Sequence, residues 1–217
     1  ENLIPFCKKK KLNYHLTRDI NSNSTYKWIK NLNPDFVMCL GYPKLLKGKL
    51  LRSYKNKIIG FHPTKLPFNK GRSPIIWSLL LGLKESACTY FFITKKIDDG
   101  PIINQMKFKI KKNDNASTLY KKIISIAVKQ IPLVINKLKA KKIKHNFKSS
   151  VFKKKNFPKN IWRKRSKMEG IIDWRMSSGL IIRHINALMP PYTYAEFKYQ
   201  KKIFKIIKAK KINYKSQ

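Results

Sequence analysis

The fold of this chain is decided by residues 58–105, which read IIGFHPTKLPFNKGRSPIIWSLLLGLKESACTYFFITKKIDDGPIINQ. Residues 57–61 form a short apolar run that is typical of a buried strand, and residues 87–94 form a second one. Between them lies a loop over residues 62–72 that is rich in Pro, Gly and polar side chains. Two buried strands joined by such a loop are the core of a sheet that leaves room for a site.

Two helices and one further strand are expected around this stretch. Residues 74–81 follow Ser73, the expected N-cap, and begin with a Pro, which favours the first turn of a helix. Upstream, residues 25–32 have apolar spacing that suits a helix, with Ser24 as its expected N-cap. Residues 36–40 (FVMCL) form an unbroken apolar run, which predicts a strand covered on both faces.

Strand and helix alternate along the first part of the chain. Residues 101–110 predict a strand near the edge of the sheet, and a long helix is predicted to begin at residues 113–117 and to run to about residue 138. Such alternation is typical of an α/β protein. We therefore expect an open, Rossmann-like, mostly parallel sheet, followed by a small α+β appendage at the C-terminus.

A change in composition divides the chain. Residues 141–160 are basic and rich in Asn, and we interpret them as a linker. Residues 161–217 predict one helix and two short alternating segments, a unit too small to be stable alone. The expected organisation is a catalytic domain over residues 1–140, the linker, and a small C-terminal subdomain over residues 161–217.

The composition excludes several classes of protein. The 217 residues are 42% hydrophobic, which is enough to bury a core and argues against disorder. The 3 Cys have neither the number of a disulfide scaffold nor the spacing of metal ligands. No apolar run is long enough to span a membrane. We expect a cytoplasmic protein that binds no metal and no membrane.

The charge has two interpretations. The chain carries 50 Lys and Arg against 10 Asp and Glu, a formal net charge of +40. A polyanionic partner such as tRNA would explain this excess. Compositional drift in an AT-rich genome would also explain it, because 43 of the basic residues are Lys, only 7 are Arg, and they are scattered along the chain. We favour drift, since Arg is the better match to phosphate.

Three loops are candidates for a site, because ligands of open α/β sheets bind beyond the carboxyl ends of the strands. They are residues 41–43, residues 62–72 and residues 95–100. The second begins with His62 at the end of a strand, and the third carries Asp98. A His held by a carboxylate can act as a general base. A structural histidine and an ordinary Asp-Asp-Gly turn remain open as alternatives.

The order and spacing of several motifs give a family resemblance. The chain resembles the folate-dependent formyltransferases, which include methionyl-tRNA formyltransferase, glycinamide ribonucleotide formyltransferase and the sugar N-formyltransferases. The motifs that carry it are His62-Pro63, Leu66-Pro67, Lys70-Gly71, Pro74, Trp77, Gly82, Ser86-Ala87, Thr89 and Asp98-Asp99-Gly100. It continues in Trp162-Arg163, Arg165, Glu169-Gly170, Ile172-Asp173-Trp174 and Pro191-Tyr192.

The resemblance implies a role for each candidate site residue. His62 would be the general base for an attacking amine, and Asp98 would orient it and stabilise its charge. The co-substrate 10-formyltetrahydrofolate would bind at Gly41, Tyr42, Pro63, Leu66, Asp99 and Gly100. An anionic part of a substrate would be approached by Lys70, Gly71 and Arg72.

The chain departs from the family pattern in two places. Gly60 stands two residues before His62, where the family has an Asn whose amide helps to hold the formyl oxygen. A donor of this kind is worth about 2.7–4 kcal/mol of transition-state stabilisation. The family's first strand, turn and helix are also expected to be missing, which suggests an N-terminally truncated chain.

The expected function is transfer of a formyl group to a primary amine, and the expected acceptor is a nucleotide-linked amino sugar. The Gly71-Arg72-Ser73-Pro74 motif is the clearest match to the sugar enzymes. Methionyl-tRNA formylation is the alternative that the charge favours. A non-catalytic protein that binds RNA or another polyanion, and an inactive remnant, are the alternatives from other classes. A homodimer is a further option.

Overall fold

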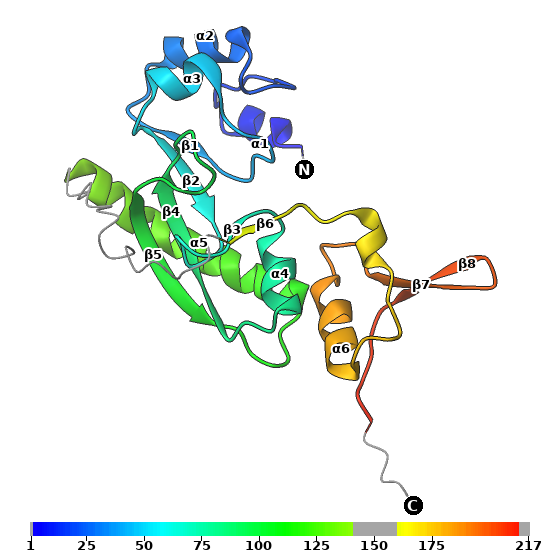
Figure 1. Cartoon of the computed structure of the whole chain (residues 1–217). Helices are drawn as coiled ribbons and strands as arrows, with labels where there is room; N and C mark the ends of the chain where they lie inside the picture. The colour runs from blue at the N-terminus through cyan, green and yellow to red at the C-terminus, as the bar shows by residue number, and fades with distance from the viewer. Residues whose placement is uncertain (1, 141–159, 213–217) are drawn as a thin grey trace, which may run out of the picture.

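The computed structural model describes residues 2–140 and 160–212, and its main feature is a four-stranded sheet (Figure 1). The strand order is β1-β2-β4-β5. The bounds are β1 Val37–Cys39, β2 Ile58–His62, β4 Glu85–Phe92 and β5 Ile102–Lys109. The predicted linker lies, apart from residue 160, outside the described residues.

The α/β class is confirmed, and β5 lies at an edge of the sheet as expected. The described sheet is mixed rather than mostly parallel. β1 and β2 are parallel, whereas β4 is antiparallel to both β2 and β5. A short loop joins β4 to β5, and a connection of that length can only return the chain antiparallel. Alternation of strand and helix in the sequence does not reveal strand direction.

Strand β1 corrects one expectation, because it is not covered on both faces. Phe36, Met38 and Leu40 are 37%, 40% and 49% exposed. The alternate residues Val37 and Cys39 pack instead against a core cluster of helices α2 (Asn23–Leu32) and α3 (Gly48–Ser53). An unbroken apolar run therefore marked a strand but did not reveal how many of its faces are buried.

Two of the expected helix caps also differ. Helix α2 begins earlier than predicted, and its N-cap is Ser22, whose side chain accepts from the backbone N–H of Thr25. A cap residue bonds the N–H two or three positions on, which Ser22 can do here. Ser73 precedes helix α4 (Pro74–Leu80) but adopts φ +52° and makes no side-chain cap bond. A short helix α1 (Ile4–Lys9) was not predicted.

The long helix α5 (Ala116–Lys139) lies along one face of the sheet (Figure 1). Asn115 begins it with a capping box, within the predicted range. Val134 and Leu138 pack onto Ile59 and Tyr90 of the sheet. This face is therefore closed by α5, and a ligand must approach the sheet from elsewhere.

The C-terminal unit shares its core with the first. Helix α6 (Ser178–Ala187) packs on α4, and Ile185 joins the cluster that contains Ile76 and Leu119. The unit also has a 3-10 helix (Lys167–Gly170) and a hairpin of β7 (Ala195–Tyr199) and β8 (Lys202–Ile206) at the end opposite α2 and α3 (Figure 1). The shared cluster supplies the burial that so small a unit lacks alone.

A second contact joins the two units beside the sheet. Strand β3 (Lys70–Gly71) pairs in parallel with β6 (Ile161–Trp162).

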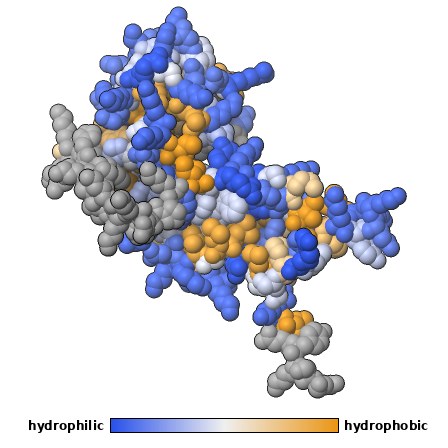
Figure 2. Space-filling model, in the orientation of Figure 1, coloured by the Kyte–Doolittle hydropathy of each residue, from blue (hydrophilic) through white to orange (hydrophobic). Residues whose placement is uncertain are grey.

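Hydrophilic residues cover much of the molecule in the view of Figure 2 and are not gathered on one element. Among the described residues, no helix combines the length and the hydrophobicity needed to cross a membrane.

Candidate active site

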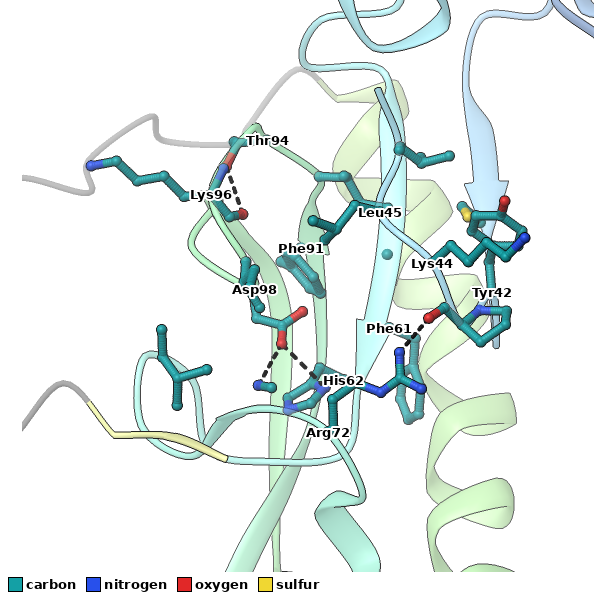
Figure 3. A pocket seen from close by; sticks show the side chains of 18 of the residues that line it. Tyr42, Lys44, Leu45, Phe61, His62, Arg72, Phe91, Thr94, Lys96 and Asp98 are labelled. Carbon is teal, nitrogen blue, oxygen red and sulfur yellow. Dashed lines mark hydrogen bonds and ion pairs between the residues drawn. The ribbon is translucent and has the colours of Figure 1, made fainter. Parts of the chain in front are cut away.

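A cavity of about 590 Å³ lies beyond the carboxyl ends of β1 and β2 (Figure 3). Its walls come from the segment after β1, from the end of β2, from β4 and its following loop, and from β6. Small-molecule sites are usually concave spaces of about 300–1,000 Å³. The expected location of the site, at the carboxyl ends of these two strands, therefore coincides with a cavity.

The alternation of strand β2 directs His62 toward this cavity. Successive side chains of a strand point to opposite faces. Ile59 and Phe61 pack on the face that α5 covers, so Gly60 and His62 belong to the opposite face. Both residues line the cavity.

The His62 side chain is buried and bonded through one ring nitrogen. Only 8% of the side chain is exposed, and Nε2 lies 3.1 Å from the carbonyl oxygen of Asn69. Because a carbonyl oxygen can only accept, we assign the ring proton to Nε2. The other nitrogen, Nδ1, lies 3.7 Å from Oδ2 of Asp98. That distance is too long for a direct hydrogen bond but short enough for electrostatic interaction.

Burial determines the protonation state of His62. Removal of the ring from water lowers the pKa of His62 below its usual 6.5, and the Asp98 carboxylate and the Asn69 carbonyl only partly oppose this. The imidazole is therefore neutral at pH 7. A proton accepted at Nδ1 would face the Asp98 carboxylate, which stabilises the resulting cation. This arrangement suits a general base.

Asp98 is held in place by the loop that it faces. The residue adopts φ +45°, a left-handed conformation in the loop after β4 that Asp tolerates better than most residues. Its Oδ2 accepts a 2.8 Å hydrogen bond from the backbone N–H of Gly71 and points toward His62 (Figure 3). The two ionisable groups, 36 positions apart in the sequence, thus meet at one wall of the cavity.

Some of the predicted site residues line the cavity, and others lie outside its lining. Those that line the cavity are His62, Asp98, Gly41, Tyr42, Gly71 and Arg72. Those that do not are Pro63, Leu66, Lys70, Asp99 and Gly100.

The predicted site residues that do not line the cavity make contacts within the surrounding loops. Lys70 is bonded to the Asp99 carboxylate. Leu66 is buried, and its carbonyl accepts from the Gln105 side chain. A side chain at Gly100 would overlap the Phe92 carbonyl. These contacts hold the loops that carry His62 and Asp98.

Sequence reasoning missed part of the lining. Ile161, Trp162 and Arg163 come from the C-terminal unit and close one side of the cavity. The Trp-Arg motif was a visible signal, but nothing in it indicated that a two-residue strand pairs with the loop before α4. Phe91 and Ile93 form an apolar floor that their strand pattern did not distinguish from core.

Gly60 also belongs to this floor. A Cβ atom at Gly60 would lie 2.9 Å from Cγ1 of Ile93 and 3.0 Å from Cζ of Phe91. Position 60 therefore offers no side-chain donor to the cavity, and its neighbours occupy the space that a larger residue would need.

Basic side chains surround the cavity. Arg72 donates to the carbonyl of Pro43, and Lys44 and Lys96 are further cations of the lining (Figure 3). Arg163 is held by a bidentate pair of hydrogen bonds to Glu169, at 2.8 and 2.6 Å. The Arg163 bonds, together with the bond from the Ser166 N–H, lower the pKa of Glu169 to about 2. Such a rim favours an anionic ligand.

Comparison with known proteins assigns the chain. The family model described as formyl transferase matches residues 3–135, more than half of the chain. The chain belongs to the formyl transferase family. The model of the formyl transferase C-terminal domain matches residues 164–217.

Named relatives within the family differ in description. The chain is 32% identical over 219 residues to the bifunctional polymyxin resistance protein ArnA of Wigglesworthia glossinidia brevipalpis. That alignment covers 96% of this chain and 32% of ArnA. The chain is also 31% identical over 136 residues to methionyl-tRNA formyltransferase of Thermodesulfovibrio yellowstonii. That alignment covers 63% of this chain and 42% of the relative. The chain thus spans less than half the length of either.

Two solved structures share the fold of this chain. Methionyl-tRNA formyltransferase from Clostridium thermocellum has a TM-score of 0.67 at 20% identity, over 97% of this chain and 88% of that one. A protein from Mycobacterium tuberculosis described as a likely sugar N-formyltransferase has a TM-score of 0.68 at 16% identity, over 92% of this chain and 85% of that one.

Proposed function

We propose that this protein transfers a formyl group from 10-formyltetrahydrofolate to a primary amine, with His62 as the general base. The observation that carries the proposal is a buried, neutral imidazole whose free Nδ1 lies 3.7 Å from the Asp98 carboxylate at a cavity wall. The cavity belongs to a chain of the formyl transferase family. The free thiols of Cys7, Cys39 and Cys88 suit the cytoplasmic location that we also propose.

The cavity has features that fit a folate. Tyr42 has a buried hydroxyl that finds no hydrogen-bond partner among the described residues, and it lines the cavity beside Gly41. Phe91 and Ile93 offer an apolar surface to a flat heterocycle. Bound 10-formyltetrahydrofolate supplies an activated formyl group. In this proposal Gly41 and Tyr42 contact it, while Pro63, Leu66, Asp99 and Gly100 support the surrounding loops.

His62 moves one proton in the proposed reaction. The amine nitrogen forms a bond to the formyl carbon, and the amine proton passes to Nδ1 of His62. The bond from the formyl carbon to the donor nitrogen breaks, and His62 returns the proton to that nitrogen. Asp98 stabilises the imidazolium that exists between these transfers.

The pH dependence follows from the lowered pKa of His62. Because burial moves that pKa below 6.5, kcat/KM expressed per unprotonated amine should be level at neutral pH and fall only at pH values under 6.5. Asp98→Asn removes a charge that raises the pKa of His62, so its acid limb should lie at lower pH and its plateau should be lower. The pH profiles of kcat/KM of wild-type protein and of Asp98→Asn are measured with the same amine. The ionisation of that amine then affects both profiles equally. An acid limb of Asp98→Asn at the same or higher pH would contradict the proposed pairing.

The space at Gly60 gives a second prediction. Gly60→Asn alone should not accelerate transfer, because Ile93 and Phe91 occupy the space. The triple variant Gly60→Asn, Phe91→Ala, Ile93→Ala clears both obstacles, so it should place an amide donor in the cavity and raise kcat by about 10- to 100-fold over the Phe91→Ala, Ile93→Ala control. That double variant should not raise kcat over wild type. Equal acceleration by the single Gly60→Asn variant would show that the floor is not the obstacle.

We propose a nucleotide-linked amino sugar as the acceptor. The support is the set of cationic side chains that line the cavity, Lys44, Arg72 and Lys96, which suits a diphosphate. The test is tetrahydrofolate release with UDP-linked and dTDP-linked amino sugars as acceptors. Saturable release that phosphate-free amino sugars do not support is the expected result. Equal turnover of both kinds of sugar would remove the role of the rim.

Methionyl-tRNA is a second candidate acceptor, and the hairpin favours it. Tyr199 and Phe204 are exposed in the hairpin, and the exposed ring of Trp174 lies edge-on against Phe197 of β7. Several Lys lie beside them, and aromatic rings can stack on bases while Lys neutralises phosphates. Transfer to charged initiator tRNA, with loss of that transfer in Phe204→Ala, would select this candidate. Salt-sensitive RNA binding without any turnover would instead indicate the non-catalytic, polyanion-binding alternative.

A further inference from the structure

One short loop orients both members of the His62–Asp98 pair. The carbonyl of Asn69 lies 3.1 Å from Nε2 of His62, and the N–H of Gly71 donates to Oδ2 of Asp98 at 2.8 Å. The two groups are two residues apart. Any movement of residues 69–71 would therefore change the orientation of the imidazole and of the carboxylate together.

Strand β6 of the C-terminal unit and Asn160, the residue directly before it, hold this loop at two points. The Gly71 end is held by the β3–β6 pairing and by a 2.8 Å hydrogen bond from the Arg72 N–H to the Trp162 carbonyl. The Asn69 end is held by Asn160, which is 91 positions away in the sequence. Oδ1 of Asn160 accepts from the Asn69 N–H at 3.0 Å, and Nδ2 of Asn160 donates to Oδ1 of Asn69 at 2.6 Å.

The backbone conformation of Asn69 explains why this end of the loop needs the hydrogen bonds from Asn160. Asn69 adopts φ +58°, a left-handed conformation that Asn tolerates but that costs free energy. A residue in this conformation persists only where its surroundings hold it. Asn160 bonds both the backbone and the side chain of Asn69, and the Asn69 carbonyl is left directed at His62.

We propose that Asn160 is a positioning residue, which fixes the Asn69 carbonyl on Nε2–H of His62 and so keeps Nδ1 as the basic nitrogen that faces Asp98. The catalytic meaning of this inference rests on the proposed function. The tautomer itself does not, since it can be measured without turnover. Asn160, directly before strand β6, would thus complete the site by setting which nitrogen of His62 accepts the proton.

The test uses three variants and two measurements. Asn160→Ala removes both bonds to Asn69. Asn160→Asp keeps the acceptor for the Asn69 N–H, and rotation of the Asn69 amide can restore the second bond. Arg183→Ala is the matched control, because it removes a different bond between the units, from Arg183 Nε to the Leu80 carbonyl. The measurements are the ¹⁵N resonances of His62 at pH 7.5, assigned by comparison with His62→Asn, and kcat and KM of formyl transfer.

The proposal predicts one neutral tautomer, protonated at Nε2, in wild-type protein, in Asn160→Asp and in Arg183→Ala. In Asn160→Ala the two ring nitrogens should approach averaged positions, and kcat should fall by about 10- to 100-fold at similar KM. An unchanged tautomer in Asn160→Ala, or an equal change in Arg183→Ala, would overturn the proposal. A tautomer change with no turnover in wild-type protein would support the positioning role and overturn the proposed function alone.

Discussion

His62→Asn is expected to lower kcat/KM for formyl transfer by about 10²- to 10⁴-fold, the usual contribution of a general base. Asn cannot accept the amine proton at neutral pH. Its amide can still donate toward the Asn69 carbonyl that now bonds the imidazole, so the loop should keep its place. Initial rates of tetrahydrofolate formation, with circular dichroism to confirm folding, measure the effect.

A second histidine provides the control for this variant. His15 stacks on Trp28 near the N-terminal helices and does not line the cavity. His15→Asn should therefore keep kcat/KM within about twofold of wild type, since His15 is half-buried against Thr25 and Trp28 and changes away from a site usually have small effects. If His62→Asn kept the wild-type rate as well, His62 would be a structural histidine and its assignment as general base would be wrong.

Gly71→Ala is expected to damage stability and turnover together. Gly71 adopts φ +103°, which L-residues rarely adopt, and an added Cβ would overlap the carbonyl of Trp162. The β3–β6 pairing must then open, and the N–H that holds Asp98 moves with it. We expect a loss of about 3 kcal/mol or more in the free energy of unfolding, because overlap adds to a conformational cost of about 1–3 kcal/mol.

Gly48→Ala separates the conformational cost of a positive φ from the cost of steric overlap. Gly48 also has a positive φ, +64°, but an added Cβ would meet nothing within 4 Å. This variant should lose only the conformational contribution to stability and should keep its kcat. Urea unfolding and initial rates of both variants make the comparison. Equal losses of stability would mean that the contact between β3 and β6 contributes little.

The local elements of this fold were largely predictable from the sequence. β2 and β4 are marked by apolar runs, and the polar residues at 113–117 indicated where α5 begins. The proximity of His62 and Asp98 was expected as well, but the rule of sheet geometry behind that expectation does not apply to Asp98. Because β4 runs antiparallel to β2, its last residue, Phe92, pairs with Ile59 near the start of β2, and the loop after β4 must fold back to bring Asp98 to His62. The features that were predictable for a correct physical reason are those that depend on residues close in sequence.

The wall contributed by the C-terminal unit was not predictable in this way. β3 and β6 have two residues each and lie about 90 positions apart, so neither has a hydrophobic period that could indicate its partner. Lys70 shows the same limit for charges. Its sequence position beside Gly71 suggested an anion-binding role, whereas the fold brings Asp99 to it as a partner. The direction of β4 likewise depends on tertiary packing.

The central claim is that His62 in this cavity accepts a proton from an amine while a formyl group is transferred. The most direct test is tetrahydrofolate release from 10-formyltetrahydrofolate by wild-type protein and by His62→Asn, with and without a UDP-linked amino sugar, at pH 7.5. We predict release that requires both the amine and an intact His62. Amine-dependent release at the same rate in both proteins would contradict the account.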